Sequence, residues 1–290
     1  MQARGKWVEP VGVWLCCDRR IPFETTRIMG VVNVTPDSFS DGGKWFDADA
    51  AVAHGLLLAK EGADILDVGG ESTRPGAAEV DEAEELRRVL PVVRELASQS
   101  GVPVSIDTRR PGVARAAVAA GACIVNDVMP FAGDAAMAAV VRETGAGLVA
   151  MHMRGTPQSM AQMTEYGDVV AEVEAVLRAA LDYAAQQGIP AARVVVDPGI
   201  GFAKTTAQNL AVLAAVGRLA RLAPVLVGAS RKRFIGELCG EPLAEARVGG
   251  SVAAAVWSAR CGAAVVRVHD VGATRQALTV AKALADIESV

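Results

Sequence analysis

A repeated pattern constrains the fold of this 290-residue chain more than any other feature of its sequence. Four segments start with Gly-Ala after a helix-like stretch and run through apolar residues to a polar end: GADILDVGG from Gly62, GACIVNDV from Gly121, GAGLVAMHM from Gly145 and GAAVVRVHD from Gly262. Glycine ends helices because it readily adopts the left-handed conformation after the last turn. A short apolar run between helices is typical of a parallel strand that is buried on both faces. The pattern predicts a repeated helix–glycine–strand unit.

Equal spacing from these glycines predicts equal positions along the strands. Five residues after the four glycines stand Asp67, Asn126, Ala150 and Arg267. Seven residues after them stand Gly69, Val128, His152 and His269. Side chains at one offset are therefore expected at one height of a common sheet. His152 either approaches the site described below or hydrogen-bonds to a neighbouring strand.

The remaining chain fits the same unit. Four further strands are expected at residues 28–35, 102–108, 193–198 and 224–230, and amphipathic stretches such as 168–188 lie between them. Eight strands and eight helices at roughly 36 residues per unit indicate an α/β protein with a (β/α)8 TIM-barrel fold. A doubly wound open sheet is the alternative, but no G-x-G-x-x-G follows the first strand. We expect residues 28–290 to form a single catalytic barrel, and residues 1–27 to form an extension whose short β-hairpin closes the bottom of the barrel.

Composition and charge exclude several classes of protein. Hydrophobic residues make up 51% of the chain and charged residues 21%, which supplies a large core and argues against disorder. A net charge of -4 offers no footprint for nucleic acid, and no apolar run is long enough to cross a membrane. The five cysteines are odd in number and lack metal-ligand spacing, so we expect a cytoplasmic protein. The acidic run EVDEAEELRR from Glu79 is interpreted as a solvated helix face.

Polar residues gather where the predicted strands end. In a (β/α)8 barrel the active site lies at the carboxyl ends of the strands. These ends carry Asn33, Asp67, Asp107, Asn126, Asp127, Asp197, Lys232, Arg267 and His269. Any one of them alone could be a helix cap, a turn residue or a solvated charge. Their concentration at one end of one barrel indicates a binding site, because unpaired charges there would be costly.

The set divides into two chemical groups. One suits a flat heterocycle with N–H and C=O edges: Asp107, Asn126, Asp197 and Lys232. The other suits a phosphate-type anion with a hard cation such as Mg²⁺: Arg74, Arg267, His269 and the side-chain oxygen of Asn33. Together they predict a displacement in which pyrophosphate leaves. A Schiff-base role for Lys232, as in an aldolase, stays open on these residues alone.

Eight motifs now make a family resemblance visible. NVTPDSFSDGG, DVGGESTRPG, SIDT, ND, MHMRGTPQSM, DPGIGFAK, GASRKRFIG and RVHD follow one another as in the dihydropteroate synthase family, and the match runs from Ile28 to near the end of the chain. The resemblance implies a folate-biosynthesis transferase that condenses 6-hydroxymethyl-7,8-dihydropterin pyrophosphate with 4-aminobenzoate. The products would be 7,8-dihydropteroate and pyrophosphate, and sulfonamides, which mimic aminobenzoate, would be inhibitors.

The resemblance also implies roles for individual residues. Pterin contacts are expected from Asp107, Asn126, Met151, Asp197, Phe202 and Lys232. Aminobenzoate contacts are expected from Thr73, Pro75 and Ser230, and pyrophosphate contacts from Arg74, Arg267 and His269. Asn33 would bind Mg²⁺, and catalysis would depend on Asp37, Thr73, Arg74, Lys232 and Arg267. Residues 35–43 and the segment around Thr73 would be two mobile loops that close over the substrates. Carbon–oxygen cleavage ahead of amine attack is the mechanism we expect.

One departure from the family pattern keeps other functions open. Met129-Pro130-Phe131 stands where the family usually has small residues. This bulk leaves room for a protein that binds pterin without turnover. A corrinoid-dependent methyltransferase shares the fold and the pterin-side pattern, but it needs neither Ser230-Arg231-Lys232 nor Arg267-Val268-His269. The apolar segment 251–264 suggests a homodimer contact through the last two helices, with ordinary burial as the alternative.

Overall fold

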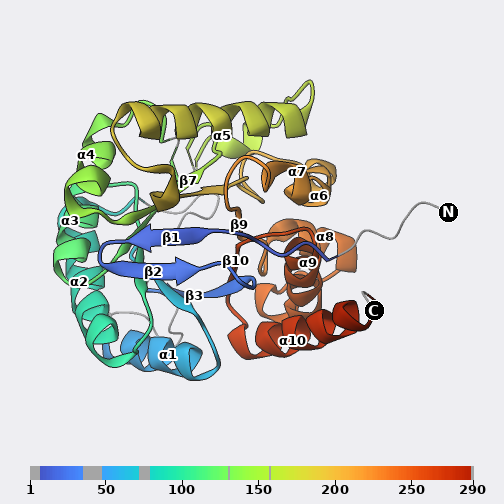
Figure 1. Ribbon diagram of the computed structural model, residues 1–290, viewed down its shortest axis with the longest axis horizontal. Coiled ribbons are helices and arrows are strands. Elements are labelled where there is room, and N and C mark those ends of the chain that lie inside the picture. Colours follow the sequence, from blue (N-terminus) through green and yellow to red (C-terminus); the bar gives the residue numbers. More distant parts are fainter. Residues whose placement is uncertain (1–6, 35–47, 72–78, 130, 157, 289–290) are drawn as a thin grey trace.

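Eight parallel strands form a single closed ring. The computed structural model describes residues 7–34, 48–71, 79–129, 131–156 and 158–288, in which the strand order is β8-β7-β6-β5-β4-β3-β10-β9 (Figure 1). A parallel bridge between Val196 of β8 and Val225 joins the two ends of this order. The strands are β3 (Arg27–Asn33), β4 (Ile65–Gly69), β5 (Val104–Asp107), β6 (Ile124–Asp127), β7 (Gly147–Met151), β8 (Val194–Asp197), β9 (Leu226–Val227) and β10 (Val265–Val268). The predicted (β/α)8 barrel is confirmed.

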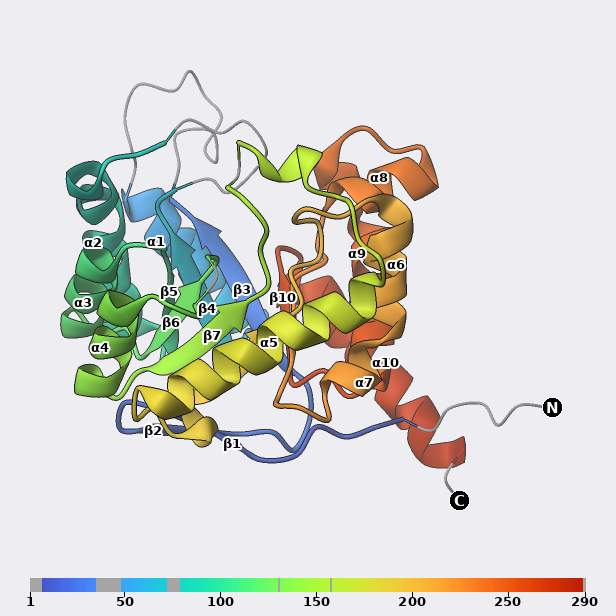
Figure 2. The same cartoon turned by 90° about the horizontal axis from the view of Figure 1, so that it is seen from above.

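Helices surround the ring and separate its strands (Figures 1 and 2). They are α1 (Ala48–Lys60), α2 (Glu82–Gln99), α3 (Pro111–Ala119), α4 (Ala135–Thr144), α5 (Val169–Gln186), α6 (Thr206–Ala214), α7 (Val216–Leu219), α8 (Arg233–Cys239), α9 (Val248–Arg260) and α10 (Val271–Glu288). The four glycines of the repeat all have positive φ: Gly62 102°, Gly121 115°, Gly145 69° and Gly262 92°. Their conformation explains why the sequence pattern marks the helix ends so regularly.

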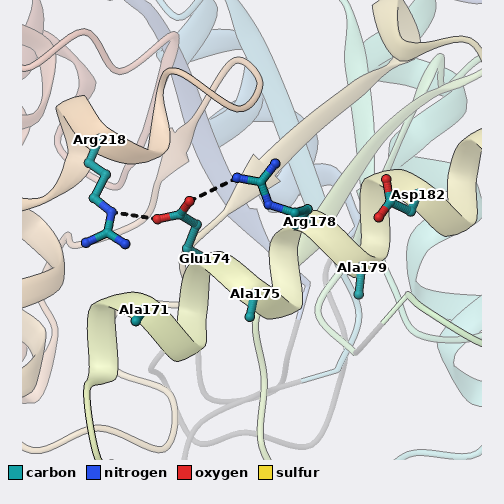
Figure 3. Close-up of a pocket in the computed structure, with 7 residues that line it drawn as sticks. All are labelled: Ala171, Glu174, Ala175, Arg178, Ala179, Asp182 and Arg218. Atoms are coloured by element: carbon teal, nitrogen blue, oxygen red, sulfur yellow. Dashed lines mark hydrogen bonds and ion pairs between the residues drawn. The ribbon is translucent and has the colours of Figure 1, made fainter.

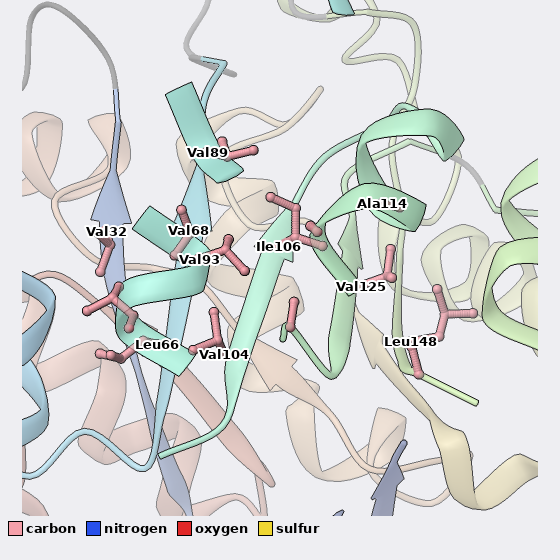
Figure 4. Close-up of a cluster of buried hydrophobic side chains, with 14 of the residues drawn as sticks. Val32, Leu66, Val68, Val89, Val93, Val104, Ile106, Ala114, Val125 and Leu148 are labelled. Atoms are coloured by element: carbon pink, nitrogen blue, oxygen red, sulfur yellow. The ribbon is translucent and has the colours of Figure 1, made fainter. Parts of the chain in front are cut away.

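The core lies between the strands and this helical layer. Figure 4 shows Val32, Leu66, Val68, Ile106 and other strand side chains packed against residues such as Val89 and Val93 of α2. Each strand from β4 to β8 is almost wholly buried, as expected for parallel strands that face a barrel interior on one side and helices on the other.

The amino-terminal hairpin covers the end of the barrel where the strands begin. Strands β1 (Val13–Cys16) and β2 (Arg19–Pro22) pair in antiparallel register. Trp14 is 1% exposed and packs with Phe23 and with the first residues of several barrel strands. Its indole nitrogen donates a hydrogen bond of 2.8 Å to the carbonyl oxygen of Arg193, just before β8. The hairpin thus closes the barrel at the end opposite the polar strand ends (Figure 2).

Two sequence predictions about local structure were wrong. The strand expected over residues 224–230 is present but shorter: β9 is Leu226–Val227, after which the chain leaves the sheet and Ser230 lies next to His269. The acidic face of α2 is not wholly solvated, since Glu85 is completely buried. Its carboxylate lies 2.5 Å from a guanidinium nitrogen of Arg110, which precedes α3 and supplies the counter-charge.

Candidate active site

Three residues with the same offset in the repeat meet at the carboxyl ends of β4, β6 and β10. Arg267 Nε donates to Asp67 Oδ2 at 2.6 Å, and the Asn126 side-chain amide donates to the same oxygen at 3.0 Å. Arg267 Nη2 donates to Asp107 Oδ2 at 2.7 Å. Equal spacing in the sequence therefore produced equal height in the barrel, as predicted. The result is a connected polar cluster on three strands plus β5.

Asp67 is the residue that the assignment of roles from sequence missed. Its side chain is completely buried, and its Oδ2 accepts from both Arg267 and Asn126. The sequence does contain a signal for this role, because Asp67, like Asn126 and Arg267, stands five residues after a glycine of the repeat. The roles that the resemblance implies fall on residues expected to touch a substrate, and Asp67 is not among them. Asp67 instead holds two such residues in place.

Burial shifts the pKa values of charged groups at this barrel mouth, and neighbouring charges oppose or add to each shift. Burial raises the pKa of the Asp107 carboxyl to about 7; Arg267 opposes this shift and the charge of Asp67 adds to it. Burial lowers the pKa of the Lys232 ammonium to about 8, against the attraction of Asp197. Burial also raises the pKa of Asp197. Titratable groups with pKa values as close to neutral as those of Asp107 and Lys232 are typical of functional sites.

Lys232 and Asp197 face the connection between β8 and α6. Lys232 Nζ donates to the carbonyl oxygen of Ile200 and lies 4.5 Å from the centroid of the Phe202 ring. Asp197 Oδ1 accepts from the backbone N–H of Gly199 at 2.7 Å. The structure thus brings together the predicted pterin contacts from β8 and the β9–α8 connection.

An apolar group adjoins these charges. Met151 at the end of β7 packs with Met153, Met160 and Ala203, and the half-buried Phe202 packs against the same group. Three sulfur-containing side chains and an aromatic ring next to buried donors and acceptors form the kind of wall that a planar heterocycle requires. Met151 and Phe202, two of the expected pterin contacts, therefore lie in one apolar group, and the Phe202 ring adjoins Lys232.

Ser230 and His269 form a second polar group at the end of β10. Ser230 Oγ lies 3.0 Å from His269 Nδ1 and accepts from the His269 backbone N–H at 3.2 Å. The neighbouring Arg231 has φ of 59° and makes a two-point ion pair with Asp270, at 2.6 and 3.1 Å. This pair fixes the turn that carries Ser230 and Lys232.

Several predicted site residues cannot be placed. Asp37, Thr73, Arg74 and Pro75 lie outside the described residues. Asn33 is described: it ends β3 in register with Gly69, and its side chain is half-buried at the barrel mouth. Within residues 7–34, 48–71, 79–129, 131–156 and 158–288, no group of three or more His, Cys, Asp or Glu side chains could hold a metal ion.

Phe131, the aromatic residue of the unusual segment at 129–131, is buried away from the strand-end charges. Phe131 is 1% exposed and packs edge-on against Tyr183 of α5, with ring centroids 5.6 Å apart. The backbone N–H of Met129 donates to Asp127 Oδ1 at 2.9 Å. The aromatic ring therefore belongs to the core between helices, and it leaves Asn126 in place.

A hollow on the outer surface lies away from this chemistry. It has a volume of about 340 Å³ and is lined by α5 and α7 residues, among them three alanines. Figure 3 shows Glu174 between Arg178 and Arg218, to which it pairs at 3.0 and 2.6 Å. These charges satisfy one another, and we assign no function to the hollow.

Known proteins resemble this chain in both sequence and fold. Residues 29–269 match the family model described as pterin binding enzyme. The chain is 51% identical over 261 residues to the dihydropteroate synthase of Mycobacterium leprae, which covers 88% of this chain and 92% of the relative. The Xanthomonas albilineans dihydropteroate synthase solved with 4-aminobenzoic acid superposes with a TM-score of 0.88 at 50% identity, covering 96% of this chain and 98% of that one. The Burkholderia cenocepacia enzyme, solved with 7,8-dihydropteroate, gives a TM-score of 0.88 at 41% identity, covering 97% and 99%.

The barrel and its strand-end charges therefore define a pterin-binding enzyme. More narrowly, the chain belongs to the dihydropteroate synthase family. The doubly wound sheet is excluded by the closed ring, and the aldolase and corrinoid-methyltransferase alternatives lose their support because the relatives that match most of the chain are transferases of the dihydropteroate kind.

Proposed function

We propose that this protein condenses 6-hydroxymethyl-7,8-dihydropterin pyrophosphate with 4-aminobenzoate to give 7,8-dihydropteroate and pyrophosphate. One observation carries the proposal: the Asp67–Arg267–Asp107 cluster adjoins Asn126 at the mouth of a barrel that resembles dihydropteroate synthases along most of its length. This cluster offers hydrogen-bond donors and acceptors to a heterocycle, and its Arg267 offers a positive charge to an anion.

Pterin recognition follows from the hydrogen-bonding capacity of the buried groups. Ionised Asp107 and Asp197 accept N–H groups, while Asn126 both donates and accepts. Protonated Lys232 donates to a ring nitrogen or carbonyl and already lies over the Phe202 ring. A buried site of this kind discriminates strongly, because an analogue that lacks one partner leaves a buried polar group unsatisfied.

Pyrophosphate departure needs positive charge beside the leaving oxygen. Two carboxylates, Asp67 and Asp107, hold the Arg267 guanidinium and keep its pKa above the usual value although burial alone would lower it. Arg267 therefore stays charged at any working pH. With His269 and, as the resemblance implies, Arg74, it would stabilise charge that develops on the departing group.

Magnesium fits this site only as an ion brought largely by the substrate. Asn33 offers one side-chain oxygen at the barrel mouth, and no cluster of three metal-binding side chains exists in the described parts of the chain. Mg²⁺ commonly binds through one or two protein oxygens together with substrate phosphates and water. Asn33 would be such a ligand, and the bound ion would supply charge neutralisation to the pyrophosphate.

We propose a dissociative order of events, in which the carbon–oxygen bond breaks before the amine attacks. An aromatic amine is a weak nucleophile, and an electron-rich dihydropterin can stabilise a cationic methylene. Arg267 would hold the departing pyrophosphate, while the Met151–Phe202 wall would keep water from the cation. Rapid-quench experiments without amine should detect pyrophosphate and a bound pterin species; a strict requirement for amine before any pyrophosphate forms would disprove this order.

A direct assay tests the overall reaction. Purified protein, the dihydropterin pyrophosphate, Mg²⁺ and radiolabelled 4-aminobenzoate should give labelled dihydropteroate and equimolar pyrophosphate. Chelation of Mg²⁺ should stop both, and Asn33→Ala should raise the Mg²⁺ concentration needed for half-maximal rate. Tight pterin binding with no product would instead mark a non-catalytic binding protein. A sulfonamide that competes with aminobenzoate would add independent support.

We also propose a homodimer that works in the cytoplasm. Helices α6, α9 and α10 carry exposed apolar side chains, with Leu210 42%, Trp257 50%, Val280 60% and Leu284 60% exposed, and α9 contacts both of the other helices. Across the described helices, none is long and apolar enough to cross a membrane. Light scattering after size exclusion should give twice the chain mass, and Trp257→Glu should reduce it to that of one chain. A wild-type monomer would refute the dimer.

A further inference from the structure

Lys204 is a buried amine to which the proposed reaction gives no role. It lies between β8 and α6, two residues before the helix begins, and its residue is 9% exposed. Its Nζ lies 2.8 Å from the carbonyl oxygen of Gly199, 3.1 Å from that of Phe202 and 3.0 Å from His152 Nδ1. All three acceptors are uncharged, because burial and the nearby Lys204 lower the pKa of His152 to about 3. Burial lowers the pKa of the Lys204 amine to about 7, against the attraction of Asp197. A buried ammonium at this position is therefore expensive to maintain unless it serves a purpose.

His152 anchors the arrangement to the neighbouring strand. It follows β7 directly, is completely buried, and its backbone N–H donates to the carbonyl oxygen of Asp197 at 2.9 Å. Of the two possibilities for this residue, the hydrogen bond to a neighbouring strand is confirmed. Through its ring nitrogen, β7 supports the Lys204 ammonium.

The backbone around the ammonium is wound tightly. Three of its residues have positive φ: Gly199 at 67°, Gly201 at 83° and Ala203 at 47°. A Cβ on Gly199 would lie 2.0 Å from the carbonyl oxygen of His152, so the approach leaves no space. Backbone in this conformation persists only when its surroundings hold it. The Lys204 ammonium binds the first and fourth residues of the turn and so closes it from inside.

This turn presents two groups to the proposed pterin pocket. The carbonyl oxygen of Ile200 accepts from Lys232 Nζ, and the Phe202 ring lies 4.5 Å from the same nitrogen. Both groups belong to the segment that Lys204 ties together. Ser230, an expected aminobenzoate contact, is instead joined to His269, with 3.0 Å between Ser230 Oγ and His269 Nδ1.

We infer that Lys204 is a positioning residue for the pterin side of the site. Its ammonium holds residues 199–203 in the shape that places Phe202 and orients Lys232, and it does not touch substrate. The inference rests on the proposed function, and it predicts a selective effect. Loss of the ammonium should weaken binding of the pterin substrate and leave binding of aminobenzoate almost unaffected.

Lys204→Met tests this inference, since methionine keeps most of the length and removes the charge. The KM for the pterin pyrophosphate and the Kd for a non-reacting pterin should each rise about 10- to 100-fold, as expected when charged hydrogen bonds that shape a site are lost. The KM for aminobenzoate should change less than about twofold. Lys60→Met, at the exposed end of α1, is the matched control and should match the wild type in all three constants.

His152→Leu provides a second test that leaves both carbonyl contacts of Lys204 intact. It should raise the pterin KM by a smaller factor, about 2- to 5-fold, because only one of three contacts is removed. If Lys204→Met does not fold, as judged by circular dichroism, the His152 variant decides the question. Equal rises in both KM values, or pterin constants within twofold of wild type in a folded variant, would overturn the inference. Failure of the proposed function looks different, because the wild type itself would then form no dihydropteroate.

Discussion

Asp67→Asn removes a buried charge from the site and leaves its shape unchanged. In the wild type, Asp67 Oδ2 accepts from Arg267 Nε at 2.6 Å and from the Asn126 amide at 3.0 Å, with no exposure to solvent. An amide oxygen at that position keeps both hydrogen bonds but makes them weaker. Bonds to charged groups contribute about 1.5–3 kcal/mol and neutral ones about 0.5–1.5 kcal/mol. The loss is therefore about 1–2 kcal/mol, or roughly a 5- to 30-fold fall in kcat/KM for the pterin substrate.

The same substitution should shift the pH profile in a known direction. The charge of Asp67 helps to raise the pKa of Asp107 to about 7, so its removal lowers that pKa. Asp107 accepts pterin N–H groups when ionised, and the acid limb of kcat/KM reports ionisation of the free enzyme. The acid limb of the variant should thus lie at lower pH than that of the wild type, as measured by dihydropteroate formation from pH 5 to 9.

Asp64→Asn is the matched control for this experiment. Asp64 precedes β4 at its other end and also pairs with arginines, at 3.5 Å to Arg27 and 2.5 Å to Arg275. The substitution should lower the melting temperature and leave the acid limb of kcat/KM at the wild-type pH. An Asp67→Asn enzyme with wild-type kcat/KM and an unmoved acid limb would refute the role that we assign to Asp67.

Three further outcomes are expected. In the wild type, kcat/KM for the pterin substrate should be highest between about pH 7 and 8. Protonation removes the Asp107 acceptor below its pKa of about 7, and deprotonation removes the Lys232 cation above its pKa of about 8. A flat profile from pH 5 to 10 would contradict this expectation. Gly199→Ala should lower the free energy of unfolding in urea by more than about 2 kcal/mol. The new Cβ would meet a backbone oxygen at 2.0 Å, and the residue has a φ of 67°. A loss below about 0.5 kcal/mol would show that the backbone relaxes. Phe131→Ala should lower the free energy of unfolding by about 3–5 kcal/mol, because a buried cavity forms. Its kcat should stay within about twofold of wild type. A large fall in kcat in the folded variant would instead place Phe131 in the site.

The barrel could be predicted from the sequence because one physical requirement repeats along the chain. Each helix needs a residue that tolerates left-handed backbone at its end, and each following strand must be apolar on both faces. The glycines at 62, 121, 145 and 262 meet the first requirement with φ between 69° and 115°. The regular spacing then places Asp67, Asn126 and Arg267 at one height, where they bond to one another.

What failed depended on packing between elements that are distant in sequence. Glu85 belongs to an acidic helix pattern, yet Arg110 from the next unit covers it and makes its burial possible. The pairing of β9 with β10 ends at Val227, opposite Val266, and Gly228 then lies near Arg267, about one unit later in the chain. Phe131 looked like an obstruction in the site because its partner Tyr183 could not be read from local pattern. In each case the sequence gives the residue type, but the neighbour determines its role.

Lys204 illustrates the same limit within a motif. DPGIGFAK shows where glycines permit a tight turn, but nothing in those letters says that the final lysine turns back into it. Only the contacts to Gly199, Phe202 and His152 reveal that arrangement. Roles assigned from a family pattern favour residues that touch substrate, and they pass over residues that hold those in place.

Pyrophosphate release with the dihydropterin pyrophosphate, Mg²⁺ and 4-aminobenzoate supplied together is the most direct measurement of the proposed activity. The wild type should release pyrophosphate and form dihydropteroate in equal amounts. Arg267→Ala should largely abolish both, because it removes the cation that Asp67 and Asp107 hold at the barrel mouth. Tight pterin binding by a well-folded wild type that releases no pyrophosphate would contradict the account.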